Sequence, residues 1–84
     1  MGYYYFKCRS ITYAQRASKA LYGKGIYAMI VKLPLKYSDE GCGYSLKISE
    51  RQFEKAYDVL IKSGFVISKI LTSKDGNTFK EVLL

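Results

Sequence analysis

The residues best suited to chemistry are two cysteines, and one of them, Cys42, stands between two glycines. Gly41 and Gly43 place little steric restriction on the backbone and leave the neighbouring sulfur uncrowded. A thiol that solvent can reach and ionise is a nucleophile, whereas a buried cysteine is inert. We therefore predict that Cys42 is reactive. The alternative interpretation is a small residue that happens to lie in a glycine turn.

The second cysteine, Cys8, ends a stretch in which apolar and polar positions alternate as in a half-buried strand. It shares its parity with Tyr4 and Phe6, so we predict that Cys8 is a core residue. A disulfide between Cys8 and Cys42 is the alternative, and it depends on a distance that the sequence does not give.

Length and composition indicate a single domain, residues 1–84, because the chain is too short for a second core. Its hydrophobic content of 49% and charged content of 25% are ordinary for a soluble globular protein. We find no apolar stretch long enough to span a bilayer and no pattern of a signal peptide. The expected location is therefore the cytoplasm, without a membrane partner, where cysteines are mostly thiols.

The chain contains no histidine, the commonest general base and metal ligand. A structural zinc site would need both cysteines together with carboxylates or a second chain. We therefore expect no metal, no cofactor and no enzymatic turnover.

The formal net charge of +7 is unevenly distributed along the chain. This asymmetry indicates an anionic partner, such as a phosphorylated ligand, a nucleic acid or an acidic protein face. The alternative is a soluble surface that is simply rich in lysine. Residues 1–35 contain six basic residues and no acidic one: Lys7, Arg9, Arg16, Lys19, Lys24 and Lys32.

Hydrophobic periodicity and turn residues predict seven elements in the order β-α-β-β-α-β-β. Their expected ranges are 3–8, 12–22, 26–33, 44–48, 50–63, 65–71 and 78–83. The strand 26–33 is nearly all apolar, so we expect it to be well buried. Asp75-Gly76 is a hairpin signal, which makes 72–84 a C-terminal hairpin extension.

This order predicts an α+β fold, a ferredoxin-like βαββαβ sandwich with an antiparallel sheet and two helices on one face. In the expected strand order 4-1-3-2, the first and third strands are central neighbours. The end of the first strand, the start of the first helix and the start of the third strand then share one edge of the sheet. Cys8 and Cys42 are accordingly expected near one another.

The positive end of the first helix, together with Arg9 and Lys36, would favour a thiolate at this edge. The unpaired backbone amides there would also bind an anion such as sulfate, selenide or phosphate. The candidate site has Cys42 as its reactive residue and six surrounding residues: Cys8, Arg9, Ser10, Thr12, Gly41 and Gly43.

Several segments follow one another in this chain: the strand Tyr3-Tyr4-Tyr5-Phe6, the alanine-rich helix 10–21, Lys24-Gly25-Ile26, Leu33-Pro34 and Cys42-Gly43-Tyr44-Ser45-Leu46. Together they resemble the small bacterial family described as selenium/sulfur carrier protein-like. The resemblance covers about residues 3–71. It implies that Cys42 holds sulfur or selenium as a persulfide or selenopersulfide.

The leading hypothesis is therefore a cytoplasmic carrier or redox-thiol protein. A donor such as a cysteine desulfurase would load Cys42, and an acceptor enzyme would take the atom. The alternative is a small binding or regulatory module in which the cysteine is incidental. It would use the basic half and the sheet face of Tyr3 and Tyr5 to contact nucleic acid or a protein partner. Such a face is more often a homodimer interface or a surface covered by another segment.

Overall fold

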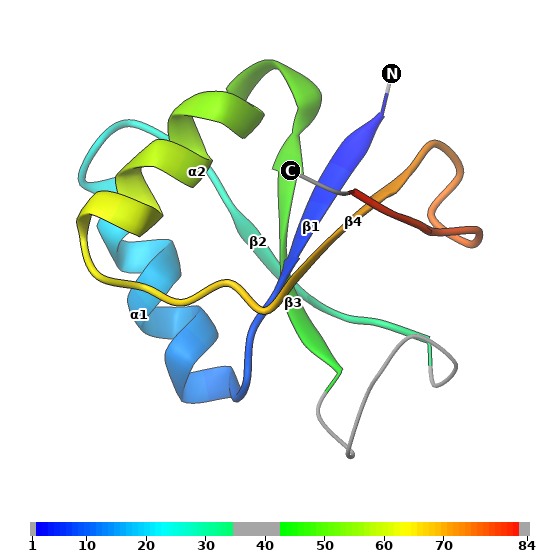
Figure 1. The fold of residues 1–84 in the computed structure, drawn as a ribbon, viewed down its shortest axis with the longest axis horizontal. Helices are drawn as coiled ribbons and strands as arrows, with labels where there is room; N and C mark the ends of the chain where they lie inside the picture. Colours follow the sequence, from blue (N-terminus) through cyan, green and yellow to red (C-terminus); the bar gives the residue numbers. More distant parts are fainter. Residues whose placement is uncertain (1, 35–42, 83–84) are drawn as a thin grey trace.

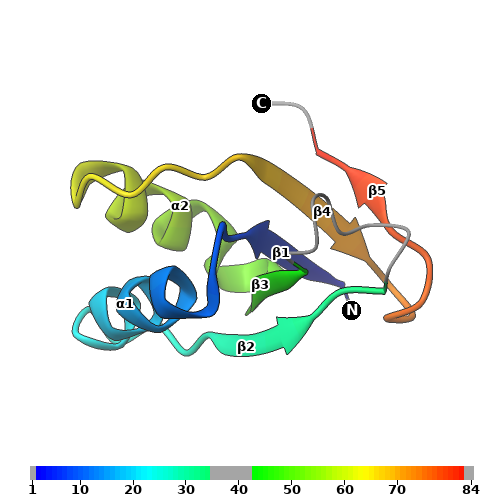
Figure 2. The same cartoon turned by 90° about the horizontal axis from the view of Figure 1, so that it is seen from below.

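Five antiparallel strands form one sheet, and two helices pack on one of its faces (Figures 1 and 2). The structure is a computed structural model that describes residues 2–34 and 43–82. The elements are β1 (Tyr3–Lys7), α1 (Ile11–Tyr22), β2 (Met29–Lys32), β3 (Tyr44–Ser49), the 3-10 turn η2 (Glu50–Gln52), α2 (Phe53–Lys62), β4 (Lys69–Ser73) and β5 (Lys80–Glu81). None of the helices in this part of the chain is long and apolar enough to cross a membrane.

The strands lie in the order β2-β3-β1-β4-β5. The predicted neighbourhood of the first and third strands is confirmed, because β1 pairs with β3 over its whole length. β4 pairs with the other side of β1. β5 pairs with β4 and adds a fifth strand to the sheet. The strand order of the whole sheet therefore differs from the expected four-stranded order 4-1-3-2.

Three strands are markedly shorter than predicted, and one of them, β5, spans only Lys80–Glu81 instead of 78–83. The prediction that 26–33 forms a well-buried strand is wrong: β2 is only Met29–Lys32, and both of its end residues are exposed. The reason is its place at the edge of the sheet, where only β3 flanks it. β4 starts at Lys69 rather than at Phe65, because the preceding segment packs on α1. The Tyr13 hydroxyl accepts a hydrogen bond from the Val66 N–H there.

The main core lies between the sheet and the two helices. Phe6 of β1 is fully buried at its centre and meets the rings of Phe53 and Tyr57 edge-on, at centroid distances of 5.7 and 6.3 Å. Small residues on α1 let this helix approach the sheet closely. The predicted inner stripe of that helix is confirmed, since its buried residues are Ala14, Ala17 and Leu21.

A smaller core covers part of the opposite sheet face, where Tyr5 is only 4% exposed. Phe79, from the connection between β4 and β5, meets the Tyr5 ring edge-on at 4.9 Å. Burial raises the pKa of the Tyr5 hydroxyl, with smaller contributions from Tyr3 and Asp75. The tyrosine face is therefore covered at Tyr5, whereas Tyr3 is 40% exposed.

The β4–β5 turn is organised by the side chain of Asp75. Its Oδ1 accepts hydrogen bonds from the N–H groups of Asn77 and Thr78, both at 2.8 Å, and from the Ser73 hydroxyl at 3.2 Å. Gly76 has a φ of 80°, in the left-handed region that favours glycine. The hairpin predicted from Asp75-Gly76 is confirmed.

We predict that Asp75→Ala lowers the melting temperature at pH 7, and that the difference from the wild type shrinks in acid. The backbone hydrogen bonds of Thr78 and Asn77 lower the pKa of Asp75 from its ordinary value of 3.8. Stability from this carboxylate is therefore present above pH 3.8 and is lost as the pH falls through the folded-state pKa. Thermal unfolding followed by circular dichroism from neutral to acidic pH measures it.

The matched control is Asp58→Ala, which removes an exposed carboxylate that pairs with Lys62 on α2. Exposed pairs of this kind contribute little to stability. Equal melting temperatures for the two variants at pH 7 would contradict the role assigned to Asp75.

Candidate functional site

The candidate site is the corner where β1 ends, α1 begins and β3 begins. The Cys8 N–H donates a hydrogen bond to the Tyr44 carbonyl at 3.0 Å, which continues the β1–β3 pairing by one residue. The Leu33 N–H donates to the Gly43 carbonyl at 2.6 Å. Gly43 is buried and is thus held between the ends of β1 and β2. The predicted meeting of the end of the first strand with the start of the third is confirmed, and the proximity of Cys8 to Cys42 stays a prediction.

The first turn of α1 lies next to this corner. Ser10 has an extended backbone, and its hydroxyl accepts a hydrogen bond from the Tyr13 N–H at 3.1 Å. Arg9 lies over the Tyr13 ring, with its guanidinium carbon 4.6 Å from the ring centroid. Arg9, Ser10 and Thr12 are all exposed. A partial positive charge at the helix end and one full cation therefore reach solvent together.

Cys8 lies beneath the surface and is only 1% exposed. Its thiol lies 3.5 Å from the Phe6 carbonyl, to which it donates a weak hydrogen bond. The prediction that Cys8 is a core residue is confirmed. Cys8 contributes to the corner through its backbone N–H, which binds the Tyr44 carbonyl. Its sulfur is buried away from solvent.

The remaining predicted site residues, Gly41 and Cys42, lie outside the described residues, as does Lys36. The structure therefore describes the surroundings of the candidate site from Cys8 to Thr12 and from Gly43 onward. Within 2–34 and 43–82, no group of three or more histidine, cysteine or acidic residues is placed to hold a metal ion.

The sequence analysis did not predict the burial of two polar residues near this corner. Lys7 and Ser45 are direct partners across the β1–β3 ladder, on the sheet face away from the helices. Lys7 is 6% exposed and Ser45 is fully buried. The Ser45 hydroxyl has no hydrogen-bond partner among the residues that the structure describes. The alternation of the strand residues predicts that both side chains lie on the sheet face away from the helices. It does not predict their burial, because burial depends on what covers that face.

The comparisons with known proteins give one match. The model of the family described as "Putative Se/S carrier protein-like" matches residues 3–72, and the chain belongs to this family. The family resemblance drawn from the sequence is thereby confirmed. No curated protein and no solved structure matches the chain significantly.

We predict that Ser10→Ala destabilises the protein by about 1 kcal/mol, because an N-cap hydroxyl satisfies a backbone donor that is otherwise unpaired. Equilibrium urea unfolding measures the change. The control is Ser63→Ala at the exposed residue that follows α2. If the two alanine variants lose the same stability, the capping role of Ser10 is wrong.

Proposed function

We propose that the protein carries a sulfane sulfur or selenium atom on Cys42, as a persulfide or selenopersulfide, and has no turnover of its own. The observation that supports this most directly is the family match over residues 3–72, a range that includes Cys42. In this proposal the scaffold is a ferredoxin-like sheet extended by β5. Cytoplasmic reducing conditions would keep the thiol available.

The geometry of the corner supports the choice of Cys42. Gly43 is fixed between the ends of β1 and β2. The proposal takes Cys42, the residue before Gly43, to act at this corner together with the exposed first turn of α1. A thiolate or persulfide anion is stabilised there by the helix end and by the cation of Arg9. Cys8 is buried and cannot serve in this role.

Loading requires a donor protein that itself holds a persulfide, such as a cysteine desulfurase. The Cys42 thiolate attacks the terminal sulfur of that persulfide, and a new sulfur–sulfur bond forms on Cys42. The bond between the two donor sulfurs breaks, and its electron pair leaves with the donor as a thiolate. No net oxidation or reduction occurs. Delivery is the same exchange, with the acceptor thiolate as the attacking group.

Intact-mass spectrometry after incubation with a cysteine desulfurase and cysteine tests the proposal. We expect an adduct of about 32 Da, one sulfur atom, that dithiothreitol removes. Cys42→Ala should abolish the adduct. Cys8→Ala is the matched control and should retain it, because the Cys8 thiol is buried. Absence of the adduct, or its persistence in Cys42→Ala, would contradict the proposal.

A further inference from the structure

β2 offers an open edge for strand pairing. Within the described ranges its only ladder is with β3, and it stands at the end of the sheet order. In an antiparallel ladder, the residues that bond to the neighbouring strand alternate with residues whose N–H and C=O point the other way. Leu33 bonds to Gly43, the residue before β3, so the N–H and C=O groups of Val31 and Met29 also point toward β3. The backbone groups of Ile30 and Lys32 therefore point outward.

On the helix side of this edge lies a basic groove. It has a volume of about 480 Å³ and is lined by residues of α1 together with Ile30 of β2. Arg16 and Lys19 of α1 line it and are exposed. Residues 2–34 contain no acidic side chain that could neutralise them. Carboxylates placed along this groove would meet the positive charge of these two side chains.

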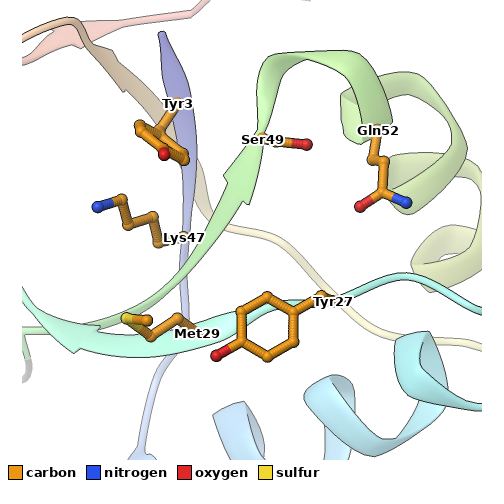
Figure 3. A pocket seen from close by; sticks show the side chains of 6 residues that line it. All are labelled: Tyr3, Tyr27, Met29, Lys47, Ser49 and Gln52. Atoms are coloured by element: carbon orange, nitrogen blue, oxygen red, sulfur yellow. The ribbon is translucent and has the colours of Figure 1, made fainter. Parts of the chain in front are cut away.

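On the other side of the same edge lies an apolar hollow of about 340 Å³ (Figure 3). Tyr27 and Met29 line it and are large exposed side chains, 67% and 46% exposed. Tyr3 and Lys47 form its far wall, with the Lys47 ammonium 4.2 Å from the centroid of the Tyr3 ring. Contiguous exposed apolar side chains of this kind mark interaction surfaces.

We propose that the β2 edge binds an extended acidic segment of a partner protein by strand addition, with acidic and apolar residues alternating in that segment. Successive side chains of a strand point to opposite faces of the sheet. The acidic set would meet Arg16 and Lys19, and the apolar set would meet Tyr27 and Met29. Backbone hydrogen bonds to Ile30 and Lys32 supply affinity, and the two flanks supply specificity. The inference does not depend on Cys42.

The charges of this edge decide between this occupant and two others. A second copy of the chain would bring Lys32 and the basic groove against identical positive charges, and lysine on an edge strand opposes such self-pairing. A nucleic acid would match the positive charge. However, it would leave the outward N–H and C=O groups of β2 without strand partners. It would also give no reason for the basic groove and the apolar hollow to lie on opposite sides of the edge. An acidic strand satisfies all three features.

Fluorescence polarisation with a labelled octapeptide, in which glutamate and valine alternate, tests the proposal. We expect saturable binding by the full chain that weakens as salt is added. The double variant Arg16→Glu/Lys19→Glu should bind at least about tenfold more weakly. The matched control, Lys74→Glu/Lys80→Glu, makes the same charge change at exposed positions near the opposite edge and should bind like the wild type. Equal weakening in both double variants would overturn the proposal.

N-methylated peptides test the backbone pairing separately from charge. A strand donates hydrogen bonds to its neighbour only from alternate N–H groups. Of two peptides, one N-methylated at the glutamates and the other at the valines, only one should therefore lose binding. In antiparallel addition the sensitive set is the glutamates, because directly paired residues share a face with Ile30 and Lys32. Equal binding of both methylated peptides would refute strand addition.

The competing occupants have readouts of their own. An equimolar single-stranded oligouridine that displaces the peptide would show a nucleic-acid site and overturn the proposal. Light scattering should report a monomer. A dimer that the peptide dissociates would show instead that a second copy occupies the edge.

Discussion

The site depends on two backbone hydrogen bonds at one end of the sheet. The Cys8 N–H holds the Tyr44 carbonyl, and the Leu33 N–H holds the Gly43 carbonyl. Together they fix the start of β3 between the ends of β1 and β2. Side chains then divide the corner into an inner and an outer part. The Cys8 thiol belongs to the core, whereas Arg9 lies at the surface on the ring of Tyr13.

Local features of the fold could be predicted from the sequence, and features set by distant contacts could not. The alternation of β1, the inner stripe of α1 and the Asp75-Gly76 turn are encoded within a few neighbouring residues, and each was found. The burial of β2 was misjudged because an apolar run does not distinguish a central strand from an edge strand. The start of β4 was misplaced because Phe65 packs edge-on against Tyr13, far away in the sequence, at a centroid distance of 5.3 Å.

The same distinction applies to the candidate site. The predicted order of strands and helices was enough to place the end of β1 beside the start of β3, because the connection rules allow few topologies for that order. The core position of Cys8 followed from its parity with Phe6. The burial of Lys7 and Ser45 could not be foreseen, because it depends on the cover of the outer face rather than on the strands themselves. The edge position of β2 was part of the expected order 4-1-3-2, whereas the exposure of Tyr27 and Met29 beside that edge was not predicted.

The central claim is that this corner keeps a thiol at residue 42 ionised, and the pH dependence of its alkylation tests that claim most directly. The measurement follows the rate of iodoacetamide addition in a Cys8→Ala background, so that one thiol reports. The account predicts an apparent pKa below the ordinary cysteine value of about 8.5. A value at or above it would contradict an activated carrier thiol and leave Cys42 as an unremarkable residue of a glycine turn.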